Sequence, residues 1–347
     1  MKPRKTLENV SAYPISSIRR RGKIRLDLNE STRGCSPKVL AALREIQWED
    51  VGAYPEYHDL KAQIAEFHHI RAEQLLLTNG ADDGIRTLMQ TYIDPGDELI
   101  LADPTFGIIA IHAKVMGATL KPVPYAADLA FPTVGFLDAI TQHTRLIAIV
   151  RPDSPTGAVI SREALRQLLQ GAPRALVMLD ETYHHFLGES LINWIDEFPN
   201  LIIMQSFSKA YCLAGLRCGF VAANPAIIRE MSKVDPPFSL NNLGVIAVRA
   251  ALADTAHLTW VVDDVRREKA RLIEQFQSLE LPVRDSAANF ILVNFGESSK
   301  AVVDALIERD ILIKSLDKIP LLRGWVRIAV GTREEHRAVL QALRLCI

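Results

Sequence analysis

The sequence predicts an α/β protein in which a mostly parallel seven-stranded sheet forms a large domain and a smaller α+β domain follows it. Short apolar segments alternate with amphipathic ones from residue 75 to about residue 223, and many of them are apolar throughout. Strands that helices cover on both faces have this pattern, and their alternation with helices indicates a parallel sheet. The expected strands are residues 75–77, 98–101, 120–123, 146–150, 175–179, 201–204 and 219–222.

The pattern changes after residue 241. A long helical region covers residues 242–279, with an expected break near the Asp254-Thr255 pair. Shorter helical and apolar segments come after it, and this mixture predicts a second, α+β unit. The expected elements are strands at residues 289–293, 311–313 and 326–330, a helix over residues 300–309 and a final helix from Arg333.

The composition excludes several classes of protein. The 347 residues carry a net charge of −1, from 40 basic and 41 acidic side chains, so we expect no nucleic-acid partner and no electrostatic membrane anchor. No apolar run approaches the ~20 residues that a membrane span requires, and the charged N-terminus lacks a secretory signal. The cysteines show neither disulfide nor metal spacing, which predicts a cytoplasmic protein without a metal site. They are Cys35, Cys212, Cys218 and Cys346.

Lys209 lies in the segment that says most about chemistry, directly after the apolar run 201–204. Burial at the end of a strand removes hydration from a lysine and favours its neutral, nucleophilic amine. Ser206 and Ser208 supply hydroxyl donors, and the guanidinium of Arg217 suits a phosphate. The segment therefore predicts a Schiff-base site for a phosphorylated aldehyde, and pyridoxal 5′-phosphate is such an aldehyde. The alternative is a surface lysine with an unrelated arginine.

Asp180 and Tyr183 fit the same cofactor. Asp180 ends the apolar strand 175–179, where a buried carboxylate would hold the proton on the ring nitrogen of the cofactor. Its alternative role is to cap the helix that follows. Tyr183, three residues on, would donate its phenol to the ring oxygen.

A glycine turn between a strand and a helix provides a candidate phosphate site. Gly80 lies between the strand 75–77 and an expected helix, and Ala81 and Asp82 begin that helix. Free backbone N–H groups and the helix dipole favour an anion there. A turn of this kind is by itself usually only a turn, so it gains weight from the segments around Asp180 and Lys209.

Together these motifs resemble the fold-type I pyridoxal-phosphate enzymes of the aspartate-aminotransferase superfamily, and most of all the histidinol-phosphate aminotransferase family. The similarity runs from about residue 28 to the last helix. The matching segments are Tyr54-Pro55-Glu56, Gly80-Ala81-Asp82, Asp103-Pro104-Thr105-Phe106-Gly107, Ser154-Pro155-Thr156-Gly157, the Asp180 and Tyr183 pair, the Lys209 to Arg217 segment, and residues 326–334.

The resemblance implies an aspartate-aminotransferase-like fold, with a large cofactor domain at residues 30–245 and a small domain from residues 1–29 and 246–347. It also implies a homodimer with shared active sites, in which Tyr54 reaches the phosphate of the neighbouring subunit. Phe106 would stack on the cofactor ring, although an ordinary core phenylalanine is the alternative. The expected phosphate cradle consists of Ser206, Ser208, Arg217 and the backbone amides of Ala81 and Asp82.

Arg327 is the expected substrate contact, since a buried arginine needs an anion and the matching family arginine holds the acidic end of the substrate. A structural salt bridge is the alternative. The sequence departs from the family at three places. Ser154 replaces an asparagine, the Asn29 to Gly34 segment replaces an Asn-Glu-Asn-Pro-aromatic-Gly pattern, and Lys314 replaces an arginine. We expect Asn29, Arg33 and Lys314 to lie near the substrate's distal end, which Arg33, Lys314 and Arg327 would keep positive.

The leading hypothesis is an aminotransferase that exchanges glutamate and 2-oxoglutarate with a small anionic substrate such as histidinol phosphate. Another amino acid or a phosphorylated amino alcohol remains open as the substrate. A phospho-amino-acid decarboxylase, similar to threonine-phosphate decarboxylase, is the second hypothesis. A non-enzymatic relic is the third, and the intact Lys209, Asp180, Tyr183 and Arg217 argue against it.

Overall fold

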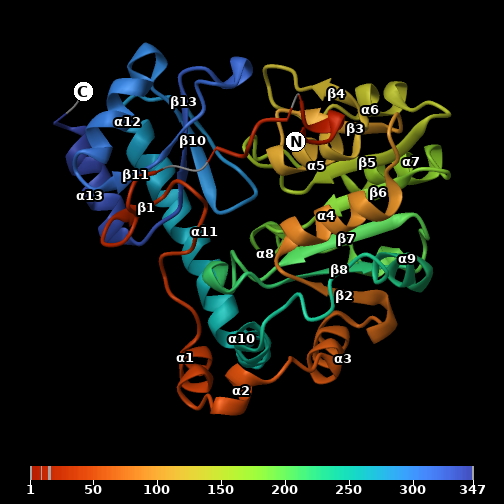
Figure 1. Cartoon of the computed structure of the whole chain (residues 1–347). Helices are drawn as coiled ribbons and strands as arrows, with labels where there is room; N and C mark the ends of the chain where they lie inside the picture. The colour runs from red at the N-terminus through yellow and green to blue at the C-terminus, as the bar shows by residue number, and fades with distance from the viewer. Residues whose placement is uncertain (1, 9, 15–16, 346–347) are drawn as a thin grey trace.

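The computed structural model describes residues 2–8, 10–14 and 17–345 (Figure 1). Its largest sheet has seven strands in the order β2-β8-β7-β6-β5-β3-β4, and each expected strand of the first region is present. These strands are β2 (Leu75–Thr78), β3 (Glu98–Asp103), β4 (Thr119–Pro124), β5 (Thr144–Val150), β6 (Leu176–Asp180), β7 (Leu201–Ser206) and β8 (Gly219–Ala223). The predicted α/β class and seven-stranded sheet are confirmed.

Only β8 runs antiparallel to its neighbours in this sheet, β2 and β7. The chain returns from β7 to β8 through residues 207–218 without a long helical crossover, and a direct return of this kind joins antiparallel strands. The return segment contains Lys209. The short return that makes β8 antiparallel therefore also places Lys209 just after the end of β7.

Helices cover both faces of the large sheet. Alternate residues of the central strands pack against α4, α5 and α9 on one face, and against α3, α6, α7 and α10 on the other. Each fully buried aliphatic side chain in these layers contributes about 1.5–3 kcal/mol. The helices of this region are α1 (Pro37–Arg44), α2 (Trp48–Gly52), α3 (His58–His68), α4 (Ala81–Tyr92), α5 (Gly107–Met116), α6 (Thr133–Ala139), α7 (Arg162–Gly171), α8 (His184–Leu187), α9 (Pro225–Met231) and α10 (Asn242–Leu252).

The C-terminal region contains a separate four-stranded sheet, whose strands have the order β12-β13-β10-β9. The helix α11 (Thr255–Gln277) runs between this sheet and the large one, contacting both β10 and α8 (Figure 1). The other elements are β9 (Val283–Arg284), β10 (Phe290–Asn294), α12 (Ser299–Ile307), β11 (Ile311–Leu312), β12 (Lys314–Ser315), β13 (Trp325–Ala329) and α13 (Arg333–Leu343). Short 3-10 helices lie at Lys5–Leu7, Ala72–Gln74, Ile192–Ile195, Ala214–Leu216, Gly296–Ser298 and Pro320–Leu322.

Two expectations for this region need refinement. The strand expected at residues 311–313 is two strands, because β11 pairs in parallel with β1 (Ile24–Arg25) whereas β12 pairs with β13. The break in the long helical region falls at residues 253–254, where the Asp254 side chain accepts from the N–H of His257. The β1–β11 pair joins residues 24–25 to the C-terminal region, whereas the 3-10 helix at Lys5–Leu7 packs against α5. The division into residues 30–245 and residues 1–29 with 246–347 stays a prediction.

No single helix of the described chain is long and apolar enough to cross a membrane, and the pair α10 and α11 reaches that length only across an 81° bend. The described cysteines, Cys35, Cys212 and Cys218, are free. Cys346 lies outside the described residues. Among the residues described, no group of three or more His, Cys, Asp or Glu side chains could hold a metal ion.

Hydrogen bonds from Gly331 and Thr332 fix the connection between β13 and the start of α13. Thr332 caps the helix and exchanges hydrogen bonds with Glu335. His336 is 2% exposed, and its Nε2 accepts from the N–H of Gly331 at 2.9 Å. Burial, and next the charge of Arg33, lower the pKa of His336 to about 4. This imidazole is therefore neutral in the folded protein at neutral pH.

The neutral state of His336 predicts a pH-dependent loss of stability. An unfolded histidine takes up a proton below about pH 6.5, whereas folded His336 does so only near pH 4. Its contribution should therefore fall by about 1.4 kcal/mol per pH unit as the pH drops from about 6.5 to 4. His336→Gln keeps an acceptor for Gly331 but does not titrate. Denaturant titrations at pH 7.5, 6, 5 and 4.5 should show that the variant loses less stability than the wild type, and equal losses would contradict this account.

Candidate active site

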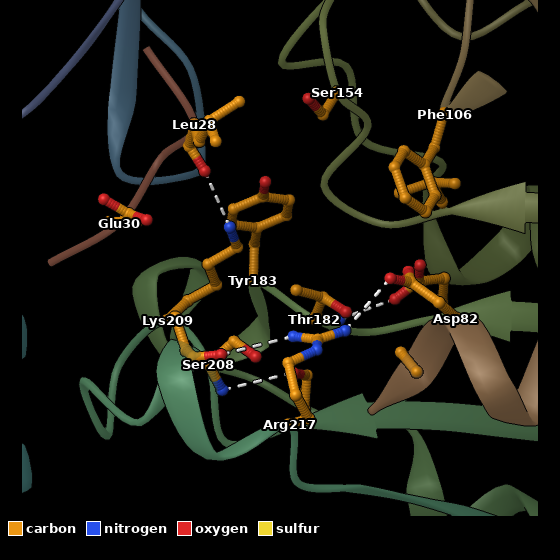
Figure 2. Close-up of a pocket in the computed structure, with 15 residues that line it drawn as sticks. Leu28, Glu30, Asp82, Phe106, Ser154, Thr182, Tyr183, Ser208, Lys209 and Arg217 are labelled. Carbon is orange, nitrogen blue, oxygen red and sulfur yellow. Dashed lines mark hydrogen bonds and ion pairs between the residues drawn. The ribbon is translucent and has the colours of Figure 1, made fainter. Parts of the chain in front are cut away.

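A pocket of about 250 Å³ lies at the carboxyl ends of the parallel strands (Figure 2), where α/β sheets bind their ligands. All predicted cofactor contacts except Gly80 and Tyr54 line this pocket. They come from five separate parts of the chain, so the fold brings together the motifs that the sequence places far apart. The lining residues from the prediction are Ala81, Asp82, Phe106, Ser154, Asp180, Tyr183, Ser206, Ser208, Lys209 and Arg217.

Lys209 extends its amine into the middle of the pocket (Figure 2). The Nζ atom donates to the carbonyl oxygen of Leu28 at 2.9 Å and lies 5.8 Å from the centre of the Tyr183 ring. The side chain is half-buried rather than fully desolvated. No carboxylate among the described residues forms a salt bridge with it, so the amine is held by one neutral carbonyl contact and by its ring neighbour.

Asp180 ends β6 at the base of the pocket and is 3% exposed. Its Oδ1 accepts from the N–H of Thr182 at 2.9 Å, and burial raises the pKa of its carboxyl to about 6. The described residues provide no salt-bridge partner for it. The alternative of a helix cap is not met, since the capping position of α8 is Tyr183. A buried carboxylate without a cation fits a protonated ring nitrogen, which would supply the missing charge.

Arg217 and the start of α4 line the end of the pocket at which we expect the phosphate. The Nη2 atom of Arg217 lies 3.1 Å from Oδ2 of Asp82, and the amide of Ser208 donates to the hydroxyl of Ser206 at 3.1 Å. The first amides of α4, at Ala81 and Asp82, have no intrahelical partners by the geometry of a helix start. Hydroxyls, a guanidinium and free amides converge here, and this donor set fits a phosphate.

Gly80 shapes this end of the pocket although it does not line it. It has φ of +86°, and a Cβ atom would lie 2.8 Å from Nη2 of Arg217. A side chain would therefore strain the backbone and displace the guanidinium as well. The glycine is needed for both reasons.

Gly80→Ala should weaken cofactor binding about tenfold or more, because the methyl group must push Arg217 away from the phosphate end. Gly96→Ala is the matched control, since Gly96 has φ of +97° with no atom near its Cβ position. Equilibrium titration with pyridoxal 5′-phosphate measures both. Equal losses in the two variants would mean that backbone strain alone is responsible.

Tyr183 is oriented by Asn29. The side-chain amide of Asn29 donates to the phenol oxygen of Tyr183 at 2.9 Å, and Asn29 is 1% exposed. Because the phenol oxygen accepts this bond, its own proton remains available to donate to an oxygen in the pocket. Asn29 was expected at the distal end of the substrate. The structure instead places it behind Tyr183, as a support for that side chain.

Arg327 is a half-buried cation next to the pocket, and no acidic side chain of the described residues pairs with it. Its Nη1 donates to Oγ of Ser154 at 2.8 Å and its Nη2 donates to the carbonyl of Asp27 at 2.7 Å. Burial lowers the pKa of the guanidinium, and it forms no salt bridge with any residue that the structure describes. The alternative of a structural salt bridge is therefore excluded within the described chain. A half-buried arginine bound only to neutral acceptors fits an anionic substrate.

Ser154, which replaces the family's asparagine, is held by the residue before it. Asp153 is 1% exposed, and its carboxylate accepts from the hydroxyls of Thr105, Tyr125 and Thr156. Burial raises the pKa of Asp153 to about 6. One carboxylate thus ties the turn that carries Ser154 to Thr105, the neighbour of Phe106.

The structure places the other two expected substrate contacts, Lys314 and Arg33, in different surroundings. Lys314 is half-buried beside Arg327, its partner across β12 and β13, and burial together with Arg327 lowers the pKa of its amine. The prediction that Arg33 contacts substrate is corrected, because its side chain is tied within the fold. It pairs with Asp264 at 2.7 Å and donates to the carbonyls of Val330 and Gly331. Sequence position alone could not reveal these partners, which come from residues more than 200 positions away.

Tyr54 lies outside the pocket. It is 77% exposed, and its ring stacks on Phe238 at a centroid distance of 4.4 Å. Its expected role concerns a neighbouring subunit, so it stays a prediction.

Several pocket residues were not predicted from the sequence. Leu28 and Glu30 line the pocket beside Lys209 (Figure 2). Tyr13 does not line the pocket but lies edge-on to Phe106, which does, with ring centres 6.3 Å apart, and partial burial raises the pKa of its phenol. The remaining unpredicted lining residues are Val150, Thr182 and Ala214. Tyr13 belongs to a segment without secondary structure, so no periodic pattern marks it.

The sequence model of class I and II aminotransferases matches residues 21–343. The chain belongs to the class I and II aminotransferase family. This aminotransferase is 35% identical over 350 residues to the histidinol-phosphate aminotransferase of Moorella thermoacetica, covering 96% of this chain and 89% of that protein. The prediction of a pyridoxal-phosphate-dependent aminotransferase is confirmed.

Solved structures agree with this assignment. The histidinol-phosphate aminotransferase of Sinorhizobium meliloti in complex with pyridoxal 5′-phosphate has a TM-score of 0.86 and 26% identity, covering 93% of this chain and 90% of that chain. The L-threonine-O-3-phosphate decarboxylase of Porphyromonas gingivalis shares the fold, with a TM-score of 0.82 and 22% identity over 93% of this chain and 98% of that chain. This aminotransferase therefore depends on pyridoxal 5′-phosphate, and its pocket offers a fitting group for each part of that molecule.

Proposed function

We propose that the protein transfers an amino group between glutamate and a small phosphorylated substrate, with histidinol phosphate as the preferred one. The half-buried Arg327 carries this proposal, because it has no acidic partner among the described residues and borders the pocket through its hydrogen bond to Ser154, where an anionic group of the substrate would complete its contacts. Lys314, on the neighbouring strand, adds positive charge to the same end. The relative from Moorella thermoacetica is named for this substrate.

The roles of the residues follow from their contacts. Bound pyridoxal 5′-phosphate supplies an aldehyde for amines and an electron-withdrawing ring. Lys209 would hold that aldehyde through its amine and would carry a proton to or from the substrate carbon. Asp180 keeps the ring nitrogen protonated, and Tyr183 donates to the ring oxygen. Arg217, with Ser206, Ser208 and the amides of Ala81 and Asp82, holds the phosphate.

We also propose a cytoplasmic homodimer with shared sites. Exposed apolar side chains gather on α2 and next to it, where Trp48 is 78%, Val51 73% and Tyr54 77% exposed. Large apolar side chains at such exposure favour a protein partner. A second copy of the chain would cover them and bring Tyr54 to the neighbouring phosphate. Sedimentation analysis tests this, and an active monomer at assay concentrations would overturn it.

A phospho-amino-acid decarboxylase is the second candidate, since the shared fold also houses that reaction. Two incubations separate the candidates. With L-glutamate, an aminotransferase loses the absorbance of its lysine-bound cofactor and releases 2-oxoglutarate. With O-phospho-L-threonine, a decarboxylase releases carbon dioxide. Stable absorbance with glutamate together with carbon dioxide release would overturn the proposed aminotransferase activity.

A further inference from the structure

The segment 27–29 contacts three functional residues of the pocket through three consecutive residues. None of these contacts involves a charged group of the segment, because two use backbone carbonyls and one uses an amide side chain. The contacts are Asp27 O with Nη2 of Arg327 at 2.7 Å, Leu28 O with Nζ of Lys209 at 2.9 Å, and Asn29 Nδ2 with the Tyr183 hydroxyl at 2.9 Å. The shape of this short segment therefore contributes to the position of all three functional groups.

The backbone of the segment is in an unusual conformation. Asn29 has φ of +54°, in the left-handed region that a side chain disfavours. Its carbonyl accepts from the side chain of Asn289 at 3.1 Å. A turn of this kind persists only when neighbouring contacts hold it.

Arg20 supplies such contacts at both ends of the turn. Its Nη2 lies 2.5 Å from Oδ1 of Asp27, and its Nη1 lies 2.8 Å from Oε1 of Glu30. Nη2 also donates to Oε2 of Glu30 at 3.2 Å. Without Arg20, two like charges three positions apart would face each other. The forked guanidinium bridges both carboxylates at once, and the single amine of a lysine lacks that geometry.

We propose that Arg20 is a positioning residue for the reaction, acting through the segment 27–30. It fixes the turn so that the Leu28 carbonyl holds the free amine of Lys209 and the Asp27 carbonyl orients Arg327. We call the ion pairs of Arg20 with Asp27 and Glu30 the clamp. Its three side chains are partly buried, with 23%, 12% and 21% exposure for Arg20, Asp27 and Glu30. Solvent therefore screens these pairs less than it screens freely exposed ones. The inference rests on the proposed aminotransferase activity.

Arg20→Gln tests the clamp, with Arg25→Gln as the matched control. Arg25 lies in the same region, reaches Glu30 only at 3.6 Å and is 43% exposed. In Arg20→Gln, we expect kcat for the glutamate half-reaction to fall about tenfold or more and KM for glutamate to rise several-fold. The affinity for pyridoxal 5′-phosphate should stay within about threefold, because Arg20 touches none of the phosphate contacts. Arg25→Gln should match the wild type in all three quantities.

A second readout does not depend on turnover. In the cofactor-free protein, amide hydrogen exchange should accelerate in the peptide that covers residues 26–31 of Arg20→Gln and stay unchanged in Arg25→Gln. Arg20→Lys keeps the charge but can bridge only one carboxylate, so its values should lie between those of the wild type and Arg20→Gln. Full recovery in Arg20→Lys would show that charge alone matters and would overturn the clamp.

These results are separable from those that test the function itself. If wild-type protein reacts with glutamate but Arg20→Gln keeps wild-type kcat, KM and exchange, the clamp is wrong and the aminotransferase assignment stands. If the wild type does not react with glutamate, the proposed function fails, and the exchange measurement still decides whether Arg20 holds the turn.

Discussion

Lys209→Ala should abolish amino transfer, lowering the rate by at least about 10³-fold, because no other described lysine amine lines the pocket. The absorbance of the lysine-bound cofactor should disappear as well. The fold should survive, since the amine makes one hydrogen bond, to the Leu28 carbonyl, and no salt bridge among the described residues. Thermal unfolding and absorbance spectra check these outcomes.

Lys233→Ala is a suitable control for this variant, since Lys233 lies on the surface with a 65% exposed side chain and an ion pair to Glu230. It should keep wild-type spectra and rates. A Lys209→Ala protein that is folded and still transfers amino groups at a rate near the wild type would mean that the reactive lysine has been assigned to the wrong residue.

Arg327→Met should raise KM for glutamate by about 10²-fold, with a smaller effect on kcat. A hydrogen bond to a charged group contributes about 1.5–3 kcal/mol, and about 1.4 kcal/mol corresponds to a tenfold change. Methionine fills similar space but binds no anion. Steady-state kinetics at several glutamate concentrations measure the effect.

The matched control for Arg327→Met is Arg284→Met, on strand β9 of the same sheet. Arg284 donates to the surface carbonyls of Ala127 and Asp128 instead of facing the pocket. Its KM should stay near that of the wild type. A KM unchanged in Arg327→Met would remove the main support for an anionic substrate at this end of the pocket.

The sequence predicted the large sheet and the centre of the pocket because both depend on local patterns. Strands covered on both faces are apolar runs, and Asp180 and Lys209 follow two such runs directly. The carboxyl ends of parallel strands meet at one edge, so residues that follow them become neighbours. These parts of the prediction required no knowledge of distant contacts.

The parts that could not be predicted depend on distant contacts. Arg33 pairs with Asp264 and Arg327 binds Ser154, and no spacing in the sequence links either pair. The two-residue strands β1, β9 and β12 are too short to carry a periodic signal. Arg20 lies in a run of three arginines, and only the folded turn at residues 27–30 distinguishes it from its neighbours.

The most direct test of the central claim is glutamate formation from histidinol phosphate and 2-oxoglutarate by the purified protein loaded with pyridoxal 5′-phosphate. Histidinol, which lacks the phosphate, is the matched substrate. We expect glutamate formation that depends on the wild-type Lys209, with kcat/KM for histidinol phosphate at least about 10²-fold above that for histidinol. Absence of glutamate formation, or equal kcat/KM for the two substrates, would contradict it.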